Sequence, residues 1–281
     1  MSKKYQLLIN SKNKDKNVSN KFVYQFPSNI FFEDTDRIGL ASISIYNSFF
    51  NITETLQNNK ITISWLGTIY NWIIPDGNYN ANQLNYWLQS KMAFENLCLI
   101  TSTGKIVYYI EIGTQPEQYA ISLTVYPIPT ATEASDLGYV QPSGATWSFP
   151  VSAETPLFTI TDEFSTLIGF NLGTYPSNVQ SITQIILSST APQLSPSNSM
   201  LITCNLINSK FSQVPNILTS VPLKANFGSL IDTDYPSPTL LNIAPGYYSE
   251  LTLNFFDQNF KALPIIDNDV IIRIVLDISN K

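Results

Sequence analysis

Histidine is absent from this 281-residue chain, and it has only two cysteines and two arginines. Without histidine, Ser-His-Asp and Cys-His triads are impossible, and the commonest proton shuttle and a frequent zinc ligand are missing. Cys98 and Cys204 lie far apart, each among apolar neighbours, which predicts two small core side chains rather than a disulfide or a zinc framework. Hydrolytic chemistry would therefore have to depend on carboxylates.

Charged residues are also scarce, at 13% of the chain, against about 25% in average proteins. The polar surface must come mainly from Asn, Ser, Thr and Gln, beside 15 Tyr and 16 Phe. A surface that is rich in aromatic residues and poor in charge is typical of the centres of protein interfaces. A codon bias toward Asn, Ile, Lys and Tyr is the alternative explanation, and composition does not separate the two.

Long apolar runs and phosphate-binding loops are missing as well. Residues 271–276 form one of the longest apolar runs, but the run is interrupted by Arg273 and is far too short for a membrane span. No apolar stretch follows the first four residues, so we expect no signal peptide and a cytosol-like compartment. The glycines do not form the spacings that bind nucleotides, and we expect no cofactor.

The few charges are unevenly distributed. Six of the 15 basic residues fall in the first 21 positions, where Asp15 is the only acid. We therefore predict a flexible basic arm over residues 1–20 ahead of an acidic body. Such arms contact packaged nucleic acid or an acidic groove on a partner, while the alternative is a solvated leader. The candidate contact residues are Lys3, Lys4, Lys12, Lys14, Lys16 and Lys21.

Strand patterns recur along the chain and predict a mainly β protein. Apolar and polar residues alternate with period 2, or β-branched residues cluster, in segments bounded by turn residues. About ten short strands with one or two short helices favour a jelly-roll β-sandwich. The predicted strands are residues 21–26, which stop at Pro27, and residues 37–46, 61–65, 69–74, 106–112, 119–126, 200–207, 248–255 and 269–278.

Local signals place two helices. Asn80 and Gln83 form a capping-box pattern, and Leu84, Trp87, Leu88 and Met92 share one face of the helix that follows. A second short helix is predicted from Asp162 to Gly169. No titratable side chain accompanies the apolar face of the first helix, so that face is expected to pack on a sheet rather than to bind a cofactor.

Two turns are predicted from their residue types. Pro75 ends a strand, and Asp76 with Gly77 permits a positive φ before the first helix. Asp257 and Gln258 supply polar turn chemistry between the last two strands. We interpret all five residues as structural rather than as ligands.

Three carboxylate pairs are the only candidates for chemistry. They are Asp34 with Asp36, Asp232 with Asp234, and Asp267 with Asp269. Paired carboxylates hydrolyse glycosides or bind calcium when a fold brings them together. We predict that each pair sits in a turn, beside Asn, Thr, Pro or Gly, and we interpret all three as structural.

Four segments resemble one family in order along the chain. They are residues 37–52, residues 74–79 with the helix that follows, residues 164–170 with 173–177, and residues 256–264. They look like segments of the minor capsid, or penton, proteins of virophages and Polinton-like viruses. The resemblance covers nearly the whole chain, starting at about Lys21.

The resemblance implies a structural virion protein without catalytic residues. It implies a jelly-roll domain over residues 21–281, with a possible inserted or protruding region at about 113–190 that includes an exposed excursion over 130–156. Members of this family form homopentamers at the fivefold vertices of an icosahedral capsid, between trimers of the major capsid protein. The implied location is the virion, assembled in the cytoplasm of the host cell. The lysine arm would lie on the inner face, against a neighbouring capsid protein or packaged DNA.

Two other classes remain open. A receptor- or carbohydrate-binding β-sandwich would place Trp72, Tyr139 or Trp147 against a sugar ring. A glycosidase that uses only carboxylates is the enzyme alternative. The sequence also leaves open whether the chain is one jelly roll with an insertion or two β domains.

Overall fold

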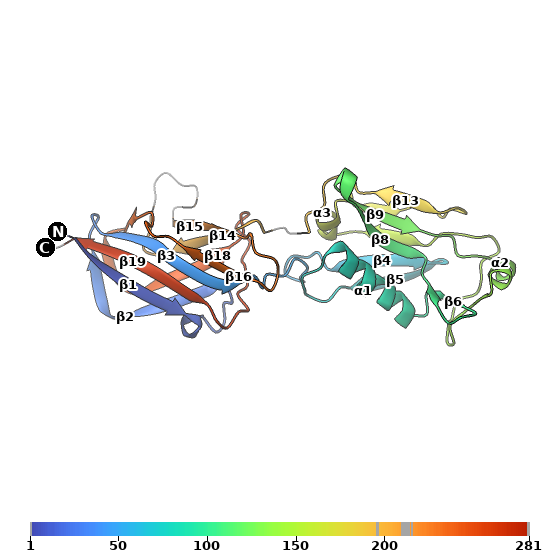
Figure 1. Ribbon diagram of the computed structural model, residues 1–281, viewed down its shortest axis with the longest axis horizontal. Coiled ribbons are helices and arrows are strands. Elements are labelled where there is room, and N and C mark those ends of the chain that lie inside the picture. The colour runs from blue at the N-terminus through green and yellow to red at the C-terminus, as the bar shows by residue number, and fades with distance from the viewer. Residues whose placement is uncertain (1, 195–196, 209–213, 215, 280–281) are drawn as a thin grey trace. The chain divides into compact units, whose positions relative to one another are not determined.

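The structure is a computed structural model that describes residues 2–194, 197–208, 214 and 216–279 (Figure 1). The chain divides into two compact units. Residues 1–49 and 197–281 form the first unit, and residues 50–196 form the second. The second unit is thus an insertion in the first, and each unit has its own hydrophobic core.

The first unit is a sandwich of two antiparallel sheets. One sheet has the order β1-β19-β3-β16, with β17 also paired to β3, and the other has the order β15-β14-β18-β2. Its strands are β1 (Ser2–Asn10), β2 (Lys21–Phe32), β3 (Arg37–Tyr46), β14 (Ser199–Cys204), β15 (Ile217–Pro222), β16 (Leu230–Asp234), β17 (Leu241–Asn242), β18 (Gly246–Phe256) and β19 (Ile271–Ser279), with a 3-10 turn at Ser11–Asn13.

This strand order is that of a jelly roll. Without the two-residue β17, the eight strands count along the unit as 1-8-3-6 in one sheet and 2-7-4-5 in the other. Two Greek keys of this kind, stacked face to face, define the eight-stranded jelly roll. The predicted fold class is confirmed, and the inserted unit falls between the third and fourth strands.

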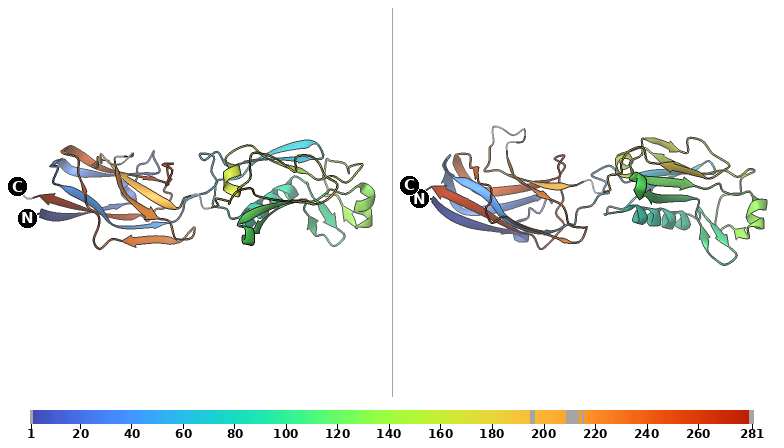
Figure 2. Two further views of the ribbon diagram at one scale, coloured as in Figure 1. Left: turned by 90° about the horizontal axis from the view of Figure 1, so that it is seen from above. Right: turned by 45° about the horizontal axis from the view of Figure 1, so that its top comes forward.

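The jelly-roll core follows from side-chain alternation. In β19, Ile272, Ile274 and Leu276 are buried and lie opposite the buried residues of β3. Their neighbours Arg273 and Asp277 point to the other face of the same sheet. From the opposite sheet, Phe22 and Phe255 meet edge to face with ring centroids 5.4 Å apart. The two layers of this unit are visible in Figure 2.

The predicted flexible arm over residues 1–20 is wrong for the residues that the structure describes; residue 1 lies outside them. Ser2–Asn10 form strand β1, which pairs with β19 from Ser2 opposite Ser279 to Asn10 opposite Ile271. Ile9 is fully buried in the core, and Leu7 packs against it. The jelly roll therefore begins at residue 2 rather than 21. Lys3 and Lys4 stand just before the alternation of Tyr5, Leu7 and Ile9, and the charge of the segment led to its assignment as an arm.

Strand β2 does not stop at Pro27, as the sequence predicted. It continues to Phe32, because β2 is an edge strand and pairing with β18 lapses between Gln25 and Ile30. At such an irregular edge the missing N–H of proline leaves no ladder bond unmade.

The inserted unit also consists mainly of strands. Its sheets have the orders β12-β11-β4-β5, β13-β9-β8 and β10-β6-β7. Its elements are β4 (Lys60–Trp65), β5 (Thr68–Ile73), α1 (Ala81–Phe94), β6 (Leu99–Thr101), β7 (Ile106–Val107), β8 (Ile110–Gln115), a 3-10 turn (Pro116–Gln118), β9 (Ala120–Val125), α2 (Ala131–Asp136), β10 (Tyr139–Val140), β11 (Leu157–Ile160), α3 (Phe164–Ile168), β12 (Gly173–Tyr175) and β13 (Gln184–Leu187).

The insertion is longer than the predicted 113–190. It begins at residue 50, so that the β4–β5 hairpin and α1, which we assigned to the jelly roll, belong to the inserted unit. The excursion predicted over 130–156 contains α2, which is capped by reciprocal bonds between Thr130 and Glu133, and the short strand β10.

Helix α1 forms where its capping box predicted it. The Asn80 side chain accepts the N–H of Gln83, and the Gln83 side chain accepts the N–H of Asn80, both at 2.9 Å. Leu84, Leu88 and Met92 are buried. The Asn85 side chain accepts the N–H of Ile112 in β8 at 2.9 Å, so the helix also satisfies a donor of that edge strand (Figure 2).

Candidate functional site

The described residues contain no group of three or more His, Cys, Asp and Glu side chains that could hold a metal ion. In the same ranges, no helix is long and apolar enough to cross a membrane. Both cysteines are buried and unpaired, as predicted. Burial raises the pKa of the Cys98 thiol, and it raises the pKa of Cys204 to about 12. Neither thiol is therefore ionised at neutral pH.

Two of the three carboxylate pairs serve backbone geometry. Asp36 is 3% exposed and accepts the N–H groups of Glu33 and Ser279, each at 2.9 Å. Asp267 accepts the N–H groups of Tyr46 and Asp269, each at 2.8 Å. These carboxylates tie loops to strand ends, as the structural interpretation predicted.

The third pair is different. Asp232 and Asp234 are exposed on β16, opposite Ser44 and Ser42 of β3, and project from the same face of the sheet. For these carboxylates, the described residues offer no ion pair or hydrogen bond. Because β16 is a strand rather than a turn, the predicted turn setting of this pair is wrong.

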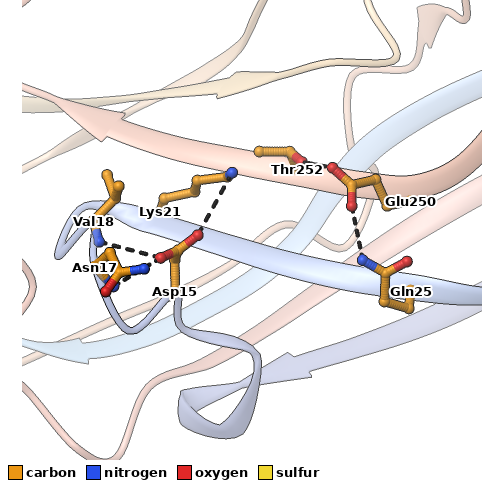
Figure 3. A network of polar contacts seen from close by, with 7 residues as sticks. All are labelled: Asp15, Asn17, Val18, Lys21, Gln25, Glu250 and Thr252. Carbon is orange, nitrogen blue, oxygen red and sulfur yellow. Dashed lines mark hydrogen bonds and ion pairs between the residues drawn. The ribbon is translucent and has the colours of Figure 1, made fainter.

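Two of the six candidate lysines contact other residues of the jelly roll through their ammonium groups. Lys14 donates to the carbonyl of Ile265, and Lys21 lies 3.6 Å from the carboxylate of Asp15 (Figure 3). The N–H of Asn17 is the main factor that lowers the pKa of Asp15, and Lys21 adds to the effect. On the neighbouring strands, Glu250 accepts a bond from Gln25 at 2.7 Å (Figure 3).

The remaining candidates, Lys3, Lys4, Lys12 and Lys16, are exposed. Lys3 and Lys4 lie on β1, and Lys12 lies in the 3-10 turn just after it. Within the described ranges their ammonium groups have no ion-pair partner. The lysines that the sequence grouped in a mobile arm are thus held on and next to one strand.

The two edges of the β1-β19-β3-β16 sheet carry opposite charge. Strand β1 presents Lys3 and Lys4 beside Tyr5 and Leu8, which are 50% and 55% exposed. Strand β16 presents Asp232 and Asp234 beside Leu230, which is 46% exposed. Sequence reasoning missed this arrangement, although the alternation in residues 5–9 was a usable signal for β1.

Comparison with solved structures shows similarity of fold. No family model and no curated protein matches the chain. The crystal structure of selenomethionine-labelled mavirus penton protein is similar to it. The similarity covers all of both chains, at 12% sequence identity and a TM-score of 0.46.

At residues 75–77, where we predicted a turn, the chain bends at Asp76 and Gly77 pairs with Ile52 in an isolated bridge. Asp76 accepts the N–H of Glu54 at 2.9 Å, and Tyr79 donates its hydroxyl hydrogen to the carbonyl of Pro75 at 3.0 Å. Gly77 does not have a positive φ. It is required because a Cβ there would lie 2.8 Å from the ring of Tyr79.

The predicted turn at Asp257 and Gln258 is confirmed. One carboxylate oxygen of the buried Asp257 accepts the N–H groups of Asn259 and Lys261, each at 2.8 Å. Gln258 accepts the N–H of Asn198 at 3.0 Å. Both side chains therefore hold the loop between β18 and β19.

Two of the aromatic residues suggested for sugar stacking pack in the core of the inserted unit. Trp72 is 5% exposed. Trp147 is part-buried, packs against Trp65 at 5.3 Å, and donates its indole N–H to the carbonyl of Asn96. Tyr139 is half-buried on β10 and packs against the same core. These side chains stabilise the core rather than form an open platform.

The inserted unit also contains an open cavity of about 520 Å³ beside α3. Its lining is uncharged and combines hydroxyl and amide groups with three apolar side chains. The lining residues are Ser165, Thr166, Phe170, Asn171, Leu172, Thr190, Ala191 and Gln193.

Proposed function

We propose that this chain is a structural virion protein, a minor capsid (penton) protein without enzymatic activity. Five copies form a ring at each fivefold vertex of an icosahedral capsid, between trimers of the major capsid protein. The location is the virion, after assembly in the cytoplasm of the host cell.

The observation that carries the proposal is the jelly-roll strand order, 1-8-3-6 against 2-7-4-5. Jelly rolls are a recurrent architecture of viral capsid proteins. The family resemblance of the sequence runs through both the jelly roll and the inserted unit, in order. A surface poor in charge, with exposed apolar side chains on sheet edges, suits contact with neighbouring subunits.

The proposal also includes a more specific contact, between exposed lysines of this chain and packaged DNA. It rests on Lys12 and Lys16, which are exposed and lie outside the edge strand β1. Binding that depends on phosphate contacts weakens steeply with salt. We expect DNA affinity to fall as salt rises, and a Lys12→Ala, Lys16→Ala variant to show a shallower salt dependence.

The mass of the purified chain in solution, by light scattering after size exclusion at two concentrations, tests the assembly. Five times 31.5 kDa is the expected result. Image reconstruction of purified particles gives the second measurement, with the chain expected at the fivefold vertices. A trimer in solution, or density away from the vertices, would contradict the penton role.

Carbohydrate binding is a second candidate, favoured by the uncharged cavity of the inserted unit, since jelly rolls are also a lectin architecture. Hydroxyl and amide groups beside an apolar ring are the groups with which proteins hold sugars. A glycan array probed with the full chain is the test. Binding that Asn171→Ala with Gln193→Ala abolishes would support it, and an array without signal would exclude the glycans tested.

A further inference from the structure

We infer that copies of this chain associate head to tail through the two edges of the β1-β19-β3-β16 sheet, with β1 of one copy against β16 of the next. The inference rests on the proposed penton function and specifies the contact through which it operates. Charge, strand direction and exposed apolar side chains each support it.

Charge complementarity is the first support. One edge carries Lys3 and Lys4, and the other carries Asp232 and Asp234. All four side chains are exposed, and their charged groups have no ion-pair partner among the described residues. The charged residues between the two edges, Arg37, Arg273 and Asp277, lie on the inner strands β3 and β19. Like edges therefore repel and unlike edges attract.

Strand direction is the second support. Every neighbouring pair in this sheet is antiparallel, so β1 and β16, at positions one and four, run in opposite directions. When a second copy stands beside the first in the same orientation, its β16 is antiparallel to β1. Within the described part of the chain, β1 pairs only with β19, and β16 pairs only with β3. Each edge thus offers unpaired backbone groups with the direction that an antiparallel ladder needs.

Exposed apolar side chains are the third support. Tyr5 and Leu8 project from β1, and Leu230 projects from β16. Aromatic residues buried at the centre of an interface commonly carry much of its binding energy. A contact between unlike edges would cover part of these side chains, with Leu8, Lys4, Leu230, Asp232 and Asp234 on the outer face of the joined sheets.

The contact is heterologous, and such contacts generate rings when the rotation closes. Each copy carries one edge of each kind, so a closed ring leaves no edge free. Lysines on an edge strand are also a known protection against strand pairing. If protection were their only role, reversal of their charge would not weaken association.

The experiment uses full-length charge-reversal variants. The β1-reversed variant carries Lys3→Glu and Lys4→Glu, the β16-reversed variant carries Asp232→Lys and Asp234→Lys, and a fourfold variant carries all four changes. A control with Lys105→Glu and Asp136→Lys reverses one exposed charge of each sign in the inserted unit. Circular dichroism verifies folding. If the β1-reversed variant fails to fold, Lys4→Glu alone replaces it. If the β16-reversed variant fails to fold, Asp234→Lys alone replaces it.

Light scattering against protein concentration gives the readout. Each single-edge variant should require at least about tenfold more protein to assemble than the wild type, since each contact exchanges attraction between oppositely charged edges for repulsion between like-charged edges. The fourfold variant should regain assembly, and the control should behave as wild type. A mixture of the two single-edge variants should form mixed species with an even number of subunits but no five-membered ring, because two alternating kinds cannot close an odd ring.

The outcomes separate this inference from the penton role. If the wild type forms a pentamer and the single-edge variants do so equally well, the edge contact is wrong and the penton role stands. If the wild type forms a ring of another size that responds to the reversals as described, the edge contact stands and the penton role fails. A wild type that stays monomeric at its highest soluble concentration overturns the edge contact, and its position in particles then decides the penton role.

Discussion

At the scale of single residues, Gly39 shows how close the packing over the jelly roll is. A Cβ at this position would lie 2.7 Å from the backbone oxygen of Thr239 and 3.0 Å from Leu240. The backbone oxygen cannot rotate away, so Gly39→Ala should lower the free energy of unfolding of the jelly roll by about 1–3 kcal/mol. Urea denaturation measures the loss. In Gly113→Ala, a Cβ would meet only the rotatable hydroxyl of Ser122, and an equal loss there would contradict the explanation.

Thiol reactivity is a second prediction at the residue scale. Cys204 is fully buried and Cys98 is 2% exposed, and burial raises both pKa values, that of Cys204 to about 12. Because the thiolate is the reactive form and both side chains are buried, native protein should resist iodoacetamide at pH 8. Protein in 8 M urea should be labelled at both positions. Mass spectrometry counts the labels, and rapid labelling of native Cys204 would show that the jelly-roll core opens.

At the scale of elements, β1 distinguishes a paired strand from a solvated arm. Ile9 is fully buried and its neighbour Leu8 is 55% exposed. Ile9→Ala should therefore lower the free energy of unfolding by about 2–5 kcal/mol, and Leu8→Ala by much less. Denaturation at low protein concentration, where assembly does not contribute, measures both. If neither Ile9→Ala nor Leu8→Ala changes the free energy of unfolding, the segment is a flexible arm rather than a paired strand.

The elements also show what local sequence signals predict. The β4–β5 hairpin and helix α1 were predicted closely, because a two-residue turn at Leu66 and Gly67 and a reciprocal cap at Asn80 act over a few residues. Strand β1 was missed because the alternation in residues 5–9 is short and follows two lysines, so that the charge of the segment decided its assignment. The extent of β2 was missed because an edge position, which tolerates Pro27, is a property of the sheet rather than of the segment.

At the scale of the molecule, the jelly roll was predicted from composition and resemblance, but the boundary of the insertion was not. Both units are rich in β-strands, so the strand pattern alone does not mark the boundary at residue 50. Which sheet a strand joins depends on partners far along the chain, such as Tyr46 with Leu230. Likewise, the opposite charges of the two sheet edges appear only after residues 2–10 and 230–234 are placed in one sheet.

The separate cores predict that the two units fold independently. Every buried residue of one cluster belongs to the jelly roll, and every buried residue of the other belongs to the inserted unit. The ends of the insertion are adjacent, because Asn51 donates to the carbonyl of Leu194 at 2.7 Å. Residues 50–196 should fold alone, and the jelly roll should fold when a short Gly/Ser linker replaces them.

Asn51 makes this independence measurable in the intact chain. It is 2% exposed, and its side chain also accepts the N–H of Tyr79 and donates to the Tyr79 carbonyl. Asn51→Ala leaves these partners unsatisfied and should destabilise the inserted unit by about 1–3 kcal/mol. In calorimetry, Asn51→Ala should lower only one of two thermal transitions, and Gly39→Ala should lower only the other. A single transition that both substitutions lower equally would show that the two units unfold as one.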